Sequence, residues 1–260
     1  MPRVTTNNGF HIGYVEAGGG SATPIVFLHG VGSDKSVWHR QLDHFGRERR
    51  AVAFDYPGYG DSDPALEGTT RDDYASAIIS AIDELGIDRA HICGLSLGGV
   101  VAIATHHEAP GRCASLILAD TFAVHPDGRA IYERSIAGST DLAGMAEARV
   151  DHLLAQPTDP EVRREVVETM SRISPFAYRI GAEAVWLADQ RERAQALDTP
   201  TLILVGDQDF ITPADLSNEL LDLIAQARMQ VIAGAGHLTN LEQPDEFNRL
   251  VNNFLAEIEP

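Results

Sequence analysis

The sequence predicts an α/β fold: a mostly parallel central sheet flanked by helices, with a helical insertion. Short apolar runs of strand length alternate with amphipathic segments of helix length, which is typical of such a sheet. This alternation stops after Thr121 and resumes with the strand-like run Thr201–Val205. The length of 260 residues suits one large domain that carries an insertion. We therefore expect a core of residues 1–121 and 196–260 and a helical lid of residues 122–195.

The elements of the first half follow from apolar spacing. Between Thr70 and Leu85, apolar residues recur at i, i+3 and i+4, which indicates one buried face of a helix. Gly86 follows, at a position where helices often end in glycine. A second helix is predicted over Leu97–His107. The predicted strands of this half are Ile25–Leu28, Ala51–Phe54, His91–Cys93 and Ser115–Ala119.

The second half begins with the insertion. From Phe122 to Gln195 the pattern is helical, with no convincing strand. The helices predicted there are Ser139–Leu154, Asp159–Ile173 and Ala177–Ala194. Strands at Thr201–Val205 and Met229–Ile232 and a final helix over 244–258 complete the core. An insertion of this kind is a candidate lid, because α/β proteins bind ligands at the carboxyl ends of their strands.

Composition excludes several classes of function. The chain has 38 acidic and 20 basic residues, a net charge of −18, which argues against nucleic-acid or anionic membrane partners. Its two cysteines, Cys93 and Cys113, suit small core residues and form neither a disulfide framework nor a zinc site. No secretory signal or membrane-spanning run is visible, so we expect a cytoplasmic protein. We expect no metal, no cofactor, a small-molecule substrate, and a monomer or a homodimer.

The strongest chemical motif is Gly94-Leu95-Ser96-Leu97-Gly98, a G-x-S-x-G sequence between a predicted strand and a predicted helix. Glycines at these positions permit a tight strand-to-helix turn that exposes the serine hydroxyl. The motif alone also occurs as a simple glycine-rich turn, and the flanking elements favour a nucleophile. Ser96 is therefore the predicted nucleophile.

A serine nucleophile needs a base, and the base needs an acid. His237 lies on a glycine-lined loop after the strand Met229–Ile232, where it could reach Ser96. Asp209 follows the strand Thr201–Val205 and is our first choice for the acid. Asp207, beside a glycine, suits a turn-former better, and Asp120 is the third option.

An oxyanion hole is also expected. Leu97, directly after the nucleophile, would offer one backbone N–H, and Val31, in the loop after the first buried strand, would offer the other. His29 precedes that loop, and we interpret it as a residue that braces the loop by hydrogen bonds rather than as a proton carrier.

Together these motifs resemble the α/β-hydrolase superfamily over nearly the whole chain. Those that carry the resemblance are His29-Gly30, Asp55–Ser62, the Ser96 turn, Gly206…Asp209…Pro213 and Gly236-His237. The chain order Ser96, Asp209, His237 is the order found in this superfamily. Haloalkane dehalogenases and epoxide hydrolases carry aspartate where this chain has Ser96. Proline iminopeptidases carry Gly-Gly-Pro-Gly where this chain has Gly30–Ser33.

Within the superfamily, Gly94–Gly99 and Gly236–Pro244 resemble 3-oxoadipate enol-lactonases and related carboxylesterases. The segment Ile131–Arg134 resembles their lid, whereas Val150–Leu154 lacks the aromatic pair expected there. The resemblance implies a serine hydrolase that cleaves a carboxylic ester or lactone through an acyl-enzyme. Alternatives are enol-lactonase-type hydrolysis of a carboxylate-bearing lactone, a carbon–carbon bond hydrolase, and a small-ligand receptor that retains the triad.

The lid is expected to select the substrate. A carboxylate-bearing lactone would call for a guanidinium, with Arg134 as the candidate; alternatively, Arg134 only pairs with neighbouring acids on a solvated helix. A neutral ester would need an apolar pocket, which Phe122, Trp186 and Phe210 could line together with Val124 and Leu187. We narrowly favour the neutral substrate from sequence.

Overall fold

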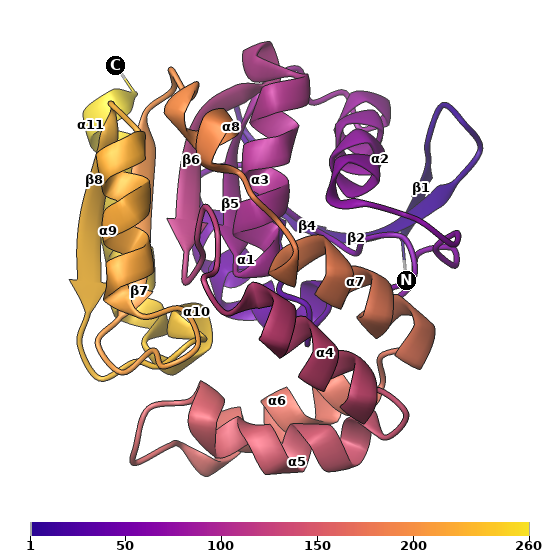
Figure 1. The fold of residues 1–260 in the computed structure, drawn as a ribbon. Coiled ribbons are helices and arrows are strands. Elements are labelled where there is room, and N and C mark those ends of the chain that lie inside the picture. The colour runs from indigo at the N-terminus through magenta and orange to yellow at the C-terminus, as the bar shows by residue number, and fades with distance from the viewer. Residues whose placement is uncertain (1, 260) are drawn as a thin grey trace.

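The computed structural model describes residues 2–259 and confirms the predicted fold class. Its eight strands form one sheet in the order β1-β2-β4-β3-β5-β6-β7-β8 (Figure 1). The first two strands pair antiparallel, β2 pairs antiparallel with β4, and every later pairing is parallel. The strands are β1 (Arg3–Thr5), β2 (His11–Ala17), β3 (Ile25–Leu28), β4 (Ala51–Phe54), β5 (Ala90–Leu95), β6 (Cys113–Ala119), β7 (Thr201–Gly206) and β8 (Ala227–Ile232).

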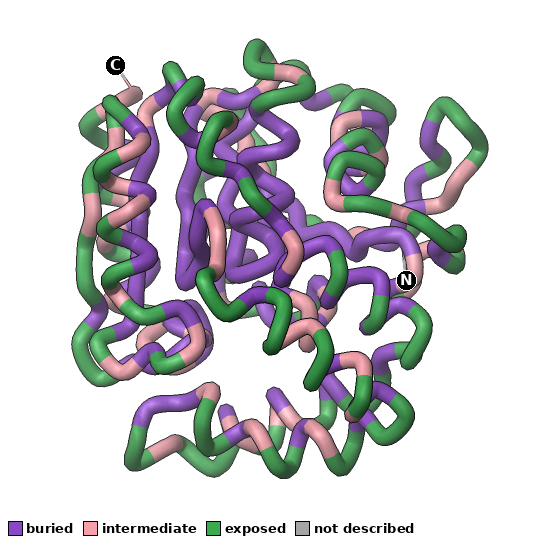
Figure 2. The backbone as a smooth tube through the Cα atoms, viewed as in Figure 1, coloured by how far each residue is buried: buried purple, intermediate pink, exposed green. Residues whose placement is uncertain are grey.

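The central strands are buried on both faces, which explains why they are continuous apolar runs rather than alternating ones. In β3, Val26 and Leu28 pack into the cluster that includes α2 (Arg71–Glu84), α3 (Leu97–Glu108) and α9 (Ala214–Leu223). Ile25 and Phe27 of the same strand face the cluster built with α1 (His39–Phe45) and α11 (Pro244–Ile258). Figure 2 shows the sheet as buried chain between helices with exposed outer sides.

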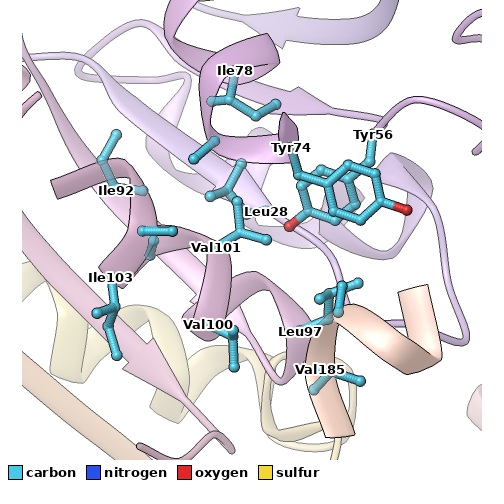
Figure 3. Packing of buried hydrophobic residues seen from close by; sticks show 14 of the residues in the cluster. Leu28, Tyr56, Tyr74, Ile78, Ile92, Leu97, Val100, Val101, Ile103 and Val185 are labelled. Atoms are coloured by element: carbon cyan, nitrogen blue, oxygen red, sulfur yellow. The ribbon is translucent and has the colours of Figure 1, made fainter. Parts of the chain in front are cut away.

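Aromatic and aliphatic side chains join helix α2 to the sheet and to the loop after β4. The rings of Tyr56 and Tyr74 stack with centroids 4.8 Å apart (Figure 3). Thr70 begins the helix as a capping box with Asp73, which satisfies backbone donors at the first turn. Helix α2 was predicted over nearly these bounds because its apolar face has regular helical spacing.

The insertion connects β6 to β7, which are neighbours in the sheet. Its helices are α4 (Gly128–Gly138), α5 (Leu142–Leu153), α6 (Pro160–Ser171), α7 (Pro175–Trp186) and α8 (Arg191–Gln195). Helices α4 to α7 gather at the end of the sheet toward which the parallel strands run (Figure 1). Helix α8 instead lies beside α3 and α9. This arrangement fits a lid formed by α4 to α7.

Several elements differ from the sequence prediction. The long helix predicted over Ala177–Ala194 is two helices, because the chain leaves α7 after Trp186 and Asp189 forms an isolated bridge with Val124. Strands β1 and β2 were not predicted, and β2 mixes apolar residues with His11, Gly13 and Glu16 at the sheet's antiparallel edge. The remaining short elements are η1 (Lys35–Trp38), η2 (Pro110–Arg112) and α10 (Thr239–Glu242).

Candidate active site

Ser96 occupies a strained turn between β5 and α3. Its φ of 55° and ψ of −115° lie outside the conformations that side-chain-bearing residues ordinarily adopt. A Cβ on Gly94 would clash with the carbonyl oxygen of Gly98, and a Cβ on Gly98 would clash with that of Leu28. The two glycines therefore permit the close approach of backbones that the turn requires, as the motif predicted.

The Ser96 hydroxyl lies within hydrogen-bond distance of His237, which itself contacts Asp209. His237 Nε2 is 3.1 Å from Ser96 Oγ, and His237 Nδ1 is 2.9 Å from Asp209 Oδ2. All three residues are buried, with at most 5% of their surface exposed. The structure thus brings together three predicted residues that are far apart in sequence.

The pKa values of Asp209 and His237 suit a histidine base that is oriented by a carboxylate. Burial alone would raise the pKa of Asp209, but the charge of His237 and hydrogen bonds from His237 and Thr212 lower it to about 2. Burial alone would lower the pKa of His237, but Asp209 outweighs that effect and raises it above the ordinary 6.5. Asp209 therefore stays ionised at neutral pH.

Thr212 contacts both Asp209 and His237, and the sequence analysis did not single it out. Its hydroxyl donates to Asp209 Oδ2 at 2.6 Å and lies 3.2 Å from His237 Nδ1. The backbone N–H groups of Ile211 and Thr212 donate to the other oxygen, Asp209 Oδ1, at 2.8 and 2.9 Å. These contacts fix the carboxylate. The one sequence feature that could have predicted these contacts is a threonine three residues after the aspartate.

The other two candidate acids lie elsewhere. Asp207 Oδ1 accepts a hydrogen bond from Gly234 N at 2.8 Å, in keeping with the turn-forming role expected of it. Asp120 is fully buried and contacts Gly206 and Thr239, not His237. Burial, and then the nearby charge of Asp209, raises the pKa of Asp120 well above its ordinary value. Asp120 therefore joins the ends of β6 and β7 to the His237 loop.

The backbone N–H groups of Val31 and Leu97, the predicted oxyanion-hole donors, have no acceptor among residues 2–259. Val31 lines the same pocket as Ser96 and His237. The hydroxyl of Tyr59 donates to the Val31 carbonyl at 3.2 Å, and this contact ties down the peptide that follows the Val31 N–H.

His29 has the surroundings of a bracing residue. Its Nδ1 lies 2.8 Å from the Gly30 carbonyl oxygen, and its ring packs against Tyr56 and Tyr59. Burial lowers the pKa of His29, so the ring is neutral at pH 7. None of its hydrogen bonds reaches Ser96, which fits the sequence interpretation.

A buried lysine joins the loops that follow β3 and β4. Lys35 Nζ lies 2.6 Å from Asp55 Oδ2 and 2.5 Å from Asp61 Oδ2. Asp55 also accepts hydrogen bonds from the backbone N–H groups of Lys35 and Asp61, each at 2.9 Å. The Asp55–Ser62 motif therefore has a structural explanation: it holds the loop beside the Val31 segment.

Ser96 opens into a narrow pocket of about 60 Å³, which adjoins a wider one of about 740 Å³. The two pockets share Arg149 and Ile211. The smaller, which we call the Ser96 pocket, is mostly apolar; the larger, which we call the outer pocket, lies among α4, α5 and the Asp209 loop. Residues lining the Ser96 pocket include Val31, Val37, Leu153, Val166, Met170, Tyr178, Trp186 and Leu238.

The four predicted substrate contacts are not all in one place. Trp186 lines the Ser96 pocket, whereas Arg134 and Phe210 line the outer pocket. Phe122 is fully buried and stacks on Trp186 with ring centroids 5.8 Å apart, behind the pocket wall. Of the four, Trp186 alone faces the space that contains Ser96.

The described part of the chain shows no group of three or more His, Cys, Asp or Glu side chains that could hold a metal ion. Within residues 2–259, no helix is long and apolar enough to cross a membrane. Both cysteines are buried and unbridged, as expected of small core residues.

Fold and site geometry together define an α/β hydrolase, and comparison with known proteins agrees. The model of the alpha/beta hydrolase family matches residues 25–250, so the chain belongs to this family. It is 26% identical over 260 residues to 3-oxoadipate enol-lactonase 1 of Acinetobacter baylyi, covering 98% of this chain and 97% of that protein.

Two further relatives show the breadth of the family. A 2-hydroxy-6-oxononadienedioate/2-hydroxy-6-oxononatrienedioate hydrolase of Klebsiella pneumoniae is 29% identical, covering 93% of this chain and 89% of that protein. The solved structure of a thermophilic esterase from Thermogutta terrifontis, with malate bound, superimposes with a TM-score of 0.91 at 26% identity. That match covers 100% of this chain and 99% of the esterase.

Proposed function

We propose that this protein hydrolyses a carboxylic ester or lactone through an acyl-enzyme on Ser96. The observation that carries the proposal is the continuous contact from Asp209 through His237 to Ser96 Oγ. The unengaged N–H groups of Val31 and Leu97 add an anion-binding position beside the hydroxyl. This is the set of groups that acyl transfer requires.

The reaction runs in two halves. His237 Nε2 accepts the Ser96 proton as Oγ attacks the carbonyl carbon, and the Val31 and Leu97 N–H groups stabilise the oxyanion. The imidazolium then gives its proton to the departing alkoxide, leaving an ester on Ser96. Water, deprotonated by His237, attacks that ester, and the acid leaves as Ser96 recovers its proton. Helices α4 to α7 of the insertion act as the lid that covers the pocket.

Two alternatives draw on other observations. A carbon–carbon bond hydrolase uses the same serine and is supported by the Klebsiella relative. A small-ligand receptor would keep Ser96, Asp209 and His237 but would not convert its ligand to a product. Ester turnover separates the receptor from both hydrolases, and activity toward esters but not toward vinylogous diketones separates ester hydrolysis from carbon–carbon cleavage.

The test is hydrolysis of p-nitrophenyl butyrate by wild type and by Ser96→Ala. We expect kcat to fall at least about a thousandfold in Ser96→Ala, with an unchanged unfolding temperature. Ser171→Ala, which removes an exposed hydroxyl on α6, is the matched control and should keep full activity. Near wild-type activity of Ser96→Ala would refute the nucleophile, and no turnover by wild type of any ester or lactone would refute the proposal.

A further inference from the structure

Arg149 on helix α5 brings a positive charge into the Ser96 pocket. It is the one lysine, arginine, aspartate or glutamate among the residues that line this pocket. It also lines the outer pocket. Arg149 therefore lies where the space around Ser96 meets the wider space through which a substrate would enter.

The guanidinium of Arg149 has few partners. It donates to the Tyr178 hydroxyl at 3.2 Å and lies 3.7 Å from the sulfur of Met145. Within residues 2–259, no carboxylate lies within 4.0 Å of it. Arg163, on the neighbouring lid helix, instead contacts both Glu147 and Asp151.

An arginine in this setting is suited to a ligand anion. A guanidinium has five N–H donors in a planar fork that matches a carboxylate. Arg149 is only partly exposed. The Ser96 pocket on one side of it is mostly apolar, whereas the outer pocket on the other side also has Asp127, Arg134 and Asp141 in its lining. A carboxylate that reached it would gain charge-assisted hydrogen bonds without having to displace a protein acid.

We propose that Arg149 binds a carboxylate of the substrate, so that the enzyme prefers esters or lactones that bear a second, ionised carboxyl group. The inference rests on the proposed function, because it names the substrate class of the same site. The narrow Ser96 pocket would take the reacting carbonyl and a short carbon chain, with the carboxylate at the junction of the two pockets. This departs from the sequence-based preference for a neutral substrate and from Arg134 as the anion-binding residue.

The experiment compares two esters that differ in one charge. Mono-p-nitrophenyl glutarate carries a free carboxylate, and its methyl ester has the same chain without the charge. After subtraction of the spontaneous rate, kcat/KM is measured for both, and their ratio is the readout. A merely structural role for Arg149 would lower both values and leave the ratio unchanged.

We expect wild type to favour the anionic ester and Arg149→Met to lower the ratio about tenfold or more. Arg149→Lys should retain part of the preference. Arg164→Met, which removes an exposed arginine of the lid that lines neither pocket, should leave the ratio within about twofold. An unchanged ratio in Arg149→Met, no anionic preference in wild type, or an equal loss in Arg134→Met would overturn the inference.

Binding tests the same inference without turnover. Glutarate should bind the Ser96→Ala protein in a calorimetric titration, and at least about tenfold more weakly the Ser96→Ala/Arg149→Met protein. If wild type hydrolyses no ester, the proposed function fails, and this titration still decides the carboxylate site. Equal glutarate affinity in the two proteins, or no binding to either, would contradict the role of Arg149.

Discussion

At the scale of residues, the sequence predicts the candidate catalytic side chains that lie in a distinctive local motif. Ser96 lies in a glycine-framed turn, and His237 lies on a glycine-lined loop, so both were predictable. Asp209 could only be ranked above Asp207 and Asp120, because nothing local says which carboxylate reaches the histidine. Thr212 and Arg149 were not predictable, since their roles depend on the packing of segments far apart in the chain.

The pH dependence of activity belongs to this scale. His237 must be neutral to accept the Ser96 proton, and Asp209 raises its pKa above 6.5. Activity should therefore fall as pH drops, with its acidic midpoint above pH 6.5. Asp209→Asn removes the charge that raises the pKa of His237, so burial should lower that pKa and move the acidic midpoint to lower pH. We also expect kcat to fall about a thousandfold or more.

Profiles of kcat/KM against pH with p-nitrophenyl butyrate measure both effects. Asp207→Asn is the matched control, because it removes a nearby carboxylate that does not contact His237, and it should keep the wild-type midpoint. An acidic midpoint that is the same in Asp209→Asn as in wild type would rule out the proposed pairing.

At the scale of elements, the helical insertion is joined by hydrogen bonds to the loop that carries His237. The backbone N–H of His237 donates to Leu153, the last residue of α5, at 2.7 Å. Glu242 accepts hydrogen bonds from Ala155 N at 2.6 Å, Gly236 N at 2.9 Å and Leu238 N at 3.2 Å. One carboxylate thus joins the end of the lid helix to both sides of His237.

Glu242→Gln tests this connection. Its two oxygens face three N–H donors, and an amide would replace one acceptor with a donor. We expect a loss of about 1–3 kcal/mol in the free energy of unfolding, together with lower kcat/KM. Urea denaturation and ester kinetics measure the two. Glu246→Gln, on an exposed pair with Arg249, should change both little; equal effects of the two variants would contradict the role of Glu242.

Helices and strands were predictable from sequence where their apolar residues follow one clear pattern. The doubly buried strands are continuous apolar runs, and α2 has a clear apolar face, so the ends of both were predicted to within two residues. Helix α4 was missed because it buries only Gly128 and Ser135. It packs against α7, a contact that the local sequence does not reveal.

At the scale of the whole molecule, the fold assembles one site from distant parts. Ser96 comes from the first half of the core, and Asp209 and His237 come from the part that follows the lid insertion. The helical insertion adds Arg149 and Trp186 to the lining of the Ser96 pocket. The net charge of −18 gives anionic substrates no long-range attraction, so their recognition depends on a local positive group.

The central claim is that folding turns Ser96 into the nucleophile. The most direct measurement is reaction with a fluorophosphonate, followed by intact-mass analysis and peptide mapping. We predict one adduct per chain on the peptide that contains Ser96, and none in Ser96→Ala or in heat-denatured wild type, where His237 no longer contacts the hydroxyl. An adduct on another residue, or native protein that does not react, would contradict the account.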